Sequence, residues 1–153
     1  MNLVAITPEL AASQRIRGSD FLRDLCASTI GLYPNGSPIL PWVGYLAEDQ
    51  GVFVGTCAFK SHPEAGEVEI AYFTFPEHEG RGIATRMAAR LADLASENGV
   101  IRVKAQTLPE RNASTRVLEK LGFSFLGGVS HPEDGEVWEW CRQEGAATGA
   151  CRS

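Results

Sequence analysis

A turn of two glycines around an arginine, Gly80-Arg81-Gly82, is the part of this sequence best suited to hold a ligand. It lies between an aromatic, strand-like run that Pro76 closes and a long helix-like run. The first N–H groups of a helix have no acceptor within the helix, and the positive end of the helix dipole lies beside them. Only small residues, Gly80, Gly82 and Ala84, border this approach, so an anion can reach the donors. Phosphate fits such an arrangement best.

Two familiar phosphate-binding patterns do not match this turn. The chain contains no GxxxxGK[ST] sequence, which rules out a P-loop. The dinucleotide pattern GxGxxG, counted from Gly80, requires a glycine at position 85, where the chain has Thr85. The turn therefore predicts a phosphate site of another kind.

The elements around the turn have clear periodicities. Residues 67–75, "EVEIAYFTF", alternate as a strand with Glu67, Glu69, Ala71, Phe73 and Phe75 on one face. From about residue 80 to residue 98, apolar residues recur at steps of four and three, which predicts an amphipathic helix that Asn98-Gly99 ends. A strand, "VIRVKAQTL", follows, and then a second helix that Asn112 caps and Gly122 ends.

The rest of the chain completes one domain. One or two helices are predicted between Thr7 and Gly31, followed by a proline-rich loop over 31–41. Two strands surround "EDQG", a hairpin whose turn we expect to be longer than the minimum. The last strands are "FSFLGG" and "GEVWEW". We expect a domain over residues 1–143 and a flexible tail over residues 144–153.

Composition excludes several classes of protein. The chain has 153 residues, 44% of them hydrophobic, and a net charge of −5, which disfavours a nucleic-acid surface. No apolar run reaches the roughly 20 residues of a membrane span, and the amino terminus does not resemble a signal peptide, so we expect a cytoplasmic protein without a membrane partner. The four cysteines and three histidines show no metal-ligand spacing, which predicts no metal site.

Two separated blocks resemble the GNAT superfamily of N-acetyltransferases. The first is "EVEIAYFTFPEHEGRGIATRMAARLADLA", with the family's [Q/R]xxGx[G/A] turn after a strand, and the second is "RVKAQTLPERNASTRVLEKLGFSFLGG". The likeness extends over about residues 40 to 140 and is closest to the branch of ribosomal-protein alanine acetyltransferases. It implies a single-domain α/β fold, the acyl-CoA N-acyltransferase fold, with a mixed, mostly antiparallel sheet flanked by helices. It also implies acetyl-CoA as co-substrate.

The resemblance assigns the cofactor site by position. Backbone N–H groups at the turn and helix start would hold the pyrophosphate, residues of the preceding strand would contact pantetheine through their backbone, and Asn112 would lie near the pantetheine arm or thioester. The pyrophosphate residues are Gly80, Arg81, Gly82, Ile83, Ala84 and Thr85, and the strand residues are Phe73, Thr74 and Phe75. The chain departs from the motif at Glu79, where the family has glutamine or arginine. We expect Glu79 to point to solvent, because a carboxylate facing a pyrophosphate would be unfavourable.

Acetyl transfer to an amine requires a base, because a lysine-like amine with a pKa near 10.4 is protonated at neutral pH. We assign Glu69 as the base, directly or through water, because it is nearer than Glu67 to the acetyl group. Glu67 is expected to assist or to bind the amine as a cation, and His131 is a second candidate base.

The acid that protonates the departing thiolate stays open. Many relatives have a tyrosine where this chain has Leu118, so the thiolate leaves unaided, takes a proton from water, or takes one from Tyr45 or Tyr72. We predict direct transfer in a ternary complex, with an acyl-CoA sensor lacking catalysis as the alternative function. The acceptor, a primary amine of a small molecule or a protein, is not identified, and the protein is expected to be a monomer or homodimer.

Overall fold

The computed structural model describes residues 1–133 and 135–144, which form one seven-stranded sheet flanked by helices. The strand order is β1-β2-β3-β4-β5-β7-β6, with β4 and β5 parallel and the other neighbours antiparallel. The strands are β1 Asn2–Ala5, β2 Gly44–Asp49, β3 Val52–Phe59, β4 Glu67–Thr74, β5 Arg102–Thr107, β6 Ser124–His131 and β7 Gly135–Gln143. The predicted mixed, mostly antiparallel sheet is confirmed. The predicted tail, apart from Glu144, lies outside the described residues.

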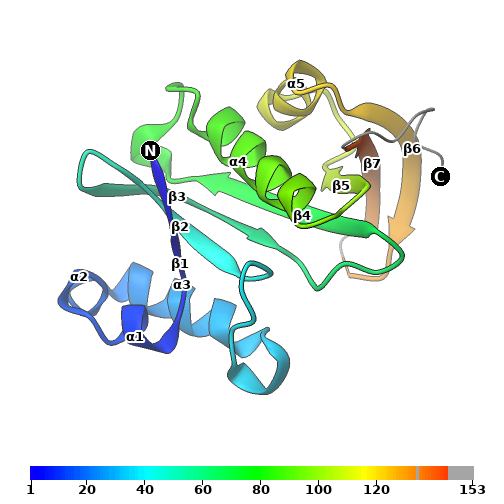
Figure 1. Cartoon of the computed structure of the whole chain (residues 1–153). Helices are drawn as coiled ribbons and strands as arrows, with labels where there is room; N and C mark the ends of the chain where they lie inside the picture. Colours follow the sequence, from blue (N-terminus) through cyan, green and yellow to red (C-terminus); the bar gives the residue numbers. More distant parts are fainter. Residues whose placement is uncertain (134, 145–153) are drawn as a thin grey trace.

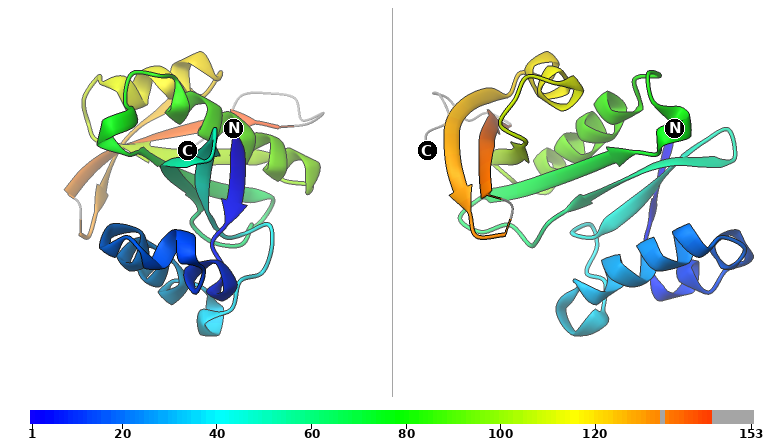
Figure 2. Two further views of the ribbon diagram at one scale, coloured as in Figure 1. Left: turned by 90° about the vertical axis from the view of Figure 1, so that its left-hand side faces the viewer. Right: turned by 180° about the vertical axis from the view of Figure 1, so that it is seen from behind.

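Helices cover both faces of the sheet (Figure 1). One face carries α1 Pro8–Ala11, α2 Gln14–Arg17 and α3 Asp20–Gly31, and α4 Ile83–Glu97 packs on the other, beside α5 Ala113–Lys120. The two further views in Figure 2 show the same separation of α1, α2 and α3 from α4. Two short 3-10 turns, Pro34–Gly36 and Pro76–His78, complete the elements. Within the described residues, no helix is long and apolar enough to cross a membrane.

Helix α4 forms where the periodicity predicts it. Its buried residues are Ile83, Met87, Ala88, Leu91, Ala92 and Ala95. All of these except Ala92 belong to the main core between the sheet and α4, together with residues of β3, β4 and β5. Because burial of this stripe fixes the rotation of the helix, it also fixes where the first turn of α4 points.

Three local features differ from the sequence-based expectations. The segment predicted to hold one or two helices forms three, α1, α2 and α3, because the caps Ser13 and Ser19 interrupt it. Strand β1 was not predicted, since its four residues carry no periodic signal. They form a strand only by pairing with β2, as in Leu3 opposite Ala47. The β2–β3 hairpin has the minimal two-residue turn, because Asp49 and Val52 are paired directly. Gln50 and Gly51 both take positive φ angles, 52° and 80°, as the tightest hairpin turns require. The expectation of a longer turn was therefore wrong.

Candidate functional site

The site begins where β4 and β5 separate. These parallel strands pair from Glu67 opposite Arg102 to Ile70 opposite Ala105 and no further. Strand β4 then continues to Thr74 and β5 to Thr107 without pairing to each other. A gap therefore opens within the sheet.

The backbone of β4 turns polar groups into this gap. The Glu69 carbonyl accepts a hydrogen bond from Lys60 N, and Phe75 N donates to the Val54 carbonyl, both at 2.9 Å and both on the β3 side. Backbone groups alternate in direction along a strand. The N–H and C=O groups of Tyr72 and Thr74 therefore face the gap. They are the strand groups best placed to bind an extended ligand.

A cavity of about 620 Å³ lies between the end of β4, the start of α4 and helix α5. From β4 and the turn it is lined by Tyr72, Phe73, Thr74, Glu79, Gly80 and Gly82. From the two helices it is lined by Ile83, Ala84, Thr85, Ala113, Ser114, Arg116, Val117 and Lys120. Most of the predicted cofactor residues thus meet in one cavity, whereas Phe75, Arg81, Asn112 and Glu69 are not among its lining residues.

The start of α4 leaves its amide donors without partners in the helix. The first backbone bond back to the cap runs from Arg86 N to the Gly82 carbonyl, at 3.2 Å. The N–H groups of Ile83, Ala84 and Thr85 therefore lack an intrahelical acceptor, and no side chain caps them. Gly82 has a φ of 74°, a conformation that L side chains rarely adopt. The cavity is consequently bordered by three donors at the positive end of a 15-residue helix.

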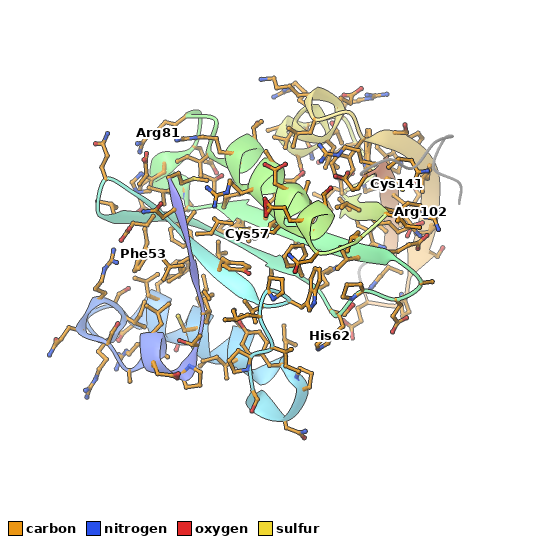
Figure 3. All side chains as sticks on the ribbon, in the orientation of Figure 1. Phe53, Cys57, His62, Arg81, Arg102 and Cys141 are labelled. Carbon is orange, nitrogen blue, oxygen red and sulfur yellow. The ribbon has the colours of Figure 1, made fainter. Side chains whose placement is uncertain are left out.

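Arg81 lies at the turn before α4 (Figure 3), where polar side chains contact it. The Arg81 guanidinium lies 3.4 Å from the Asp49 carboxylate and 2.8 Å from His78 Nδ1, and Arg86 lies 3.8 Å from Asp49. Asp49 therefore holds both arginines beside the helix start. Glu79 is exposed, as expected, yet it also borders the cavity, so only part of the prediction that it faces solvent is met.

Helix α5 supplies groups that the sequence reasoning missed. Arg116 and Lys120 line the cavity four residues apart on one helix face. In the sequence, the signal that could have identified them is the four-residue spacing of these two cations on the helix face opposite the buried Leu118. Asn112 instead caps the helix, and its side-chain oxygen accepts a hydrogen bond from Thr115 N at 3.1 Å. Two cations thus add positive charge to a cavity already bordered by helix amides.

The carboxylates of β4 lie on the face opposite α4, among cations. Glu69 immediately precedes the last paired residue, Ile70, and its carboxylate is 2.9 Å from Lys60 Nζ. Its side chain is 28% exposed, so a ligand can reach it. Glu67, farther from the gap, contacts Arg102 and, at 3.6 Å, Lys104. Glu69 is therefore the carboxylate nearer to the divergence.

Burial raises the pKa values of three side chains on strands β2, β3 and β4. Burial raises the pKa of the Cys57 thiol to about 12, so this thiol, which is 2% exposed, is not a ready nucleophile. Burial also raises the pKa of Tyr45 to about 12, and its hydroxyl donates to the Pro41 carbonyl at 2.6 Å. The Tyr72 hydroxyl also has a raised pKa because of burial, but its side chain lines the cavity. Residues 1–133 and 135–144 contain no cluster of three or more side chains suited to bind a metal.

Comparisons with known proteins agree with this geometry. The model of the acetyltransferase (GNAT) domain matches residues 18–124, while no curated protein sequence matches the chain significantly. Among solved structures, RimL, a ribosomal L7/L12 α-N-protein acetyltransferase in its apo form, is 20% identical with a TM-score of 0.67, covering 92% of this chain and 91% of that one.

Two further structures share the fold. YncA from Salmonella typhimurium, solved with its cofactor acetyl-CoA, is 23% identical with a TM-score of 0.60, covering 86% of this chain and 78% of its own. A chimera of spermidine N-acetyltransferase SpeG from Vibrio cholerae and hSSAT is 16% identical with a TM-score of 0.68, covering 94% and 96%. The split sheet and the uncapped helix start agree with the match to the domain model. The chain therefore belongs to the GNAT family of acyl-CoA-dependent N-acetyltransferases.

Proposed function

We propose that the protein transfers the acetyl group of acetyl-CoA directly to a primary amine of a small molecule or a protein. The observation that carries this proposal is the set of unpaired amides at Ile83, Ala84 and Thr85, which border the cavity at the end of the split sheet. An anion of the size of pyrophosphate fits such donors. The pantetheine arm would then run along β4, past the backbone of Thr74 and Tyr72.

The remaining charges around the cavity support this placement. Arg116 and Lys120 on α5 line the cavity and offset the phosphate charge from one side. Glu79 opposes them, since its carboxylate borders the same cavity. The cationic groups outnumber it, so the site favours an anionic ligand.

The thioester would lie near the point where β4 leaves β5, with the Tyr72 N–H turned toward its carbonyl oxygen. Glu69 lies beside this point on the opposite face of the sheet, from which the amine would approach. The carboxylate takes the proton of the amine, directly or through water, and the neutral amine attacks the carbonyl carbon. Transfer is direct, because burial keeps the Cys57 thiol protonated and out of the reaction.

The structural relatives suggest the class of acceptor. RimL is described as acting on a ribosomal protein and SpeG on spermidine, which are both amine substrates. We therefore retain both a protein and a small molecule as acceptors. The cytoplasmic location and the monomeric or homodimeric state are predictions from the sequence alone.

An acetyl-CoA assay with a panel of amines tests the proposal. We expect release of free thiol that depends on the amine, from a panel of a polyamine, an aminoglycoside and a peptide with a free amino terminus. Acetyl-CoA at about 100 times its dissociation constant should stabilise the fold by about 2.7 kcal/mol and raise Tm by roughly 5 to 10 °C. A Tm increase without thiol release for any amine would instead indicate an acyl-CoA sensor. No Tm increase at millimolar acetyl-CoA would contradict the cofactor site itself.

A further inference from the structure

We propose that Tyr72 is the acid that protonates the sulfur of the departing CoA, and that Ser114 positions its hydroxyl. This role rests on the proposed acetyl transfer. It gives the chain a proton donor from β4, in place of a side chain at the Leu118 position of α5. Leu118 is fully buried in the main core and cannot reach the cavity with a polar group.

The location of Tyr72 is the first support. It lies two residues beyond the last paired residue of β4, at the wall of the gap, and its side chain lines the cavity. Its hydroxyl is 3.1 Å from Ser114 Oγ and 3.2 Å from the Ser114 carbonyl, which accepts its proton in a hydrogen bond. Ser114 also lines the cavity. The hydroxyl is therefore fixed between the strand that would hold the thioester and the start of α5.

The other titratable groups near this hydroxyl are less suited to the step. Cys57 lies opposite Tyr72 on β3 but is 2% exposed. Lys120 is six residues beyond Ser114, about 9 Å along the helix at 1.5 Å per residue, and Arg116 holds its proton permanently. Glu79 borders the cavity from the turn that precedes α4, where the pyrophosphate would lie. Tyr45 lies on β2 and is not among the residues that line the cavity.

The reaction balances with these groups. The amine nitrogen forms a bond to the carbonyl carbon, the carbon–sulfur bond breaks, and the electron pair goes to sulfur. Sulfur takes the proton of the Tyr72 hydroxyl. Glu69 passes the first proton of the amine, that of the ammonium, to water before the attack, takes the second from the nitrogen as the amide forms, and then releases that one to water. Tyr72 regains a proton from water through the Ser114 hydroxyl, so the products are an amide and a free thiol. A thiolate is less stable in a cavity than in water, so a proton donor beside the sulfur makes its departure more favourable.

Tyr72→Phe removes the proton and keeps the ring. We expect kcat to fall by about 10²-fold, in the range of general acid catalysis, with the dissociation constant for acetyl-CoA unchanged. Tyr45→Phe is the matched control, since it removes the hydrogen-bonded hydroxyl of a buried tyrosine on the same sheet that does not line the cavity, and it should retain the wild-type kcat. Ser114→Ala should lower kcat by a smaller factor without raising KM for acetyl-CoA, and Ser114→Thr should restore it.

Three outcomes would overturn this role. Tyr72→Phe with wild-type kcat would remove Tyr72 as the acid while leaving the proposed function intact. A weaker affinity for acetyl-CoA with unchanged kcat would make Tyr72 a binding residue. A wild-type protein that shows no turnover would overturn the proposed function and the acid together. If Tyr72→Phe does not fold, an unchanged kcat in Ser114→Ala counts against the arrangement.

Discussion

Replacing Glu69 by glutamine is expected to lower kcat by roughly 10²- to 10⁴-fold, the usual contribution of a general base. The amide has nearly the size of the carboxylate but cannot take the proton of the amine. Glu69 lies on the face of the sheet opposite the cofactor cavity and does not line it, so the affinity for acetyl-CoA should stay at the wild-type value. Steady-state assays of thiol release, together with calorimetric titration of acetyl-CoA, measure the two quantities separately.

Glu67→Gln is the matched control for this variant. Glu67 lies on the same strand and the same face, two residues farther from the divergence, and contacts Arg102 and Lys104. Its replacement should change kcat far less than Glu69→Gln. Equal losses in both variants would show that negative charge on this face matters in general, and full activity of Glu69→Gln would remove Glu69 as the base.

Ala84→Glu is expected to stabilise the free protein and, at the same time, to weaken the binding of acetyl-CoA. Ala84 is the second residue of α4, where a carboxylate is favourable to the helix dipole by about 0.3–1 kcal/mol. The same carboxylate would face the pyrophosphate, and two like charges 4 Å apart repel by about 4 kcal/mol at an effective dielectric of 20. Even a third of this repulsion would raise the dissociation constant of acetyl-CoA about tenfold. Thermal unfolding of the free protein and calorimetric titration should thus change in opposite directions.

The same substitution at Ala89 controls for added charge. Ala89 is half-buried on α4, five residues beyond Ala84, and does not line the cavity. Ala89→Glu should leave the affinity for acetyl-CoA near the wild-type value. If Ala84→Glu binds acetyl-CoA as tightly as Ala89→Glu does, the helix start is not the phosphate site.

The parts of the fold that were predictable are those with local signals. The apolar residues of α4, from Ile83 to Ala95, repeat with the period of a helix, and Gly80 and Gly82 mark the turn before it. Asn112 and Gly122 bound α5 in the same way, since one is a capping residue and the other ends the helix at a φ of 86°. These signals located the uncapped helix start before any tertiary contact was known.

The remaining features depend on contacts between distant residues. β1 is defined by its pairing with β2, about 40 residues away. The cavity face of α5, with Ser114, Arg116 and Lys120, acquires its role only when α5 packs beside α4 and β4. The partners of the Tyr72 hydroxyl and of Glu69 follow from the register of the sheet and the position of α5. Sequence periodicity carries no information on such pairings.

The central claim is that the first amides of α4 bind the pyrophosphate of acetyl-CoA. The most direct measurement is a titration of the ¹⁵N-labelled protein with acetyl-CoA and, separately, with S-acetylpantetheine, which lacks the pyrophosphate. We predict that acetyl-CoA shifts the amide resonances of Ile83, Ala84 and Thr85 strongly, while S-acetylpantetheine shifts those of Tyr72 and Thr74 and leaves the three helix amides nearly unchanged. Saturation with acetyl-CoA that does not move the resonances of Ile83, Ala84 and Thr85 would contradict the claim.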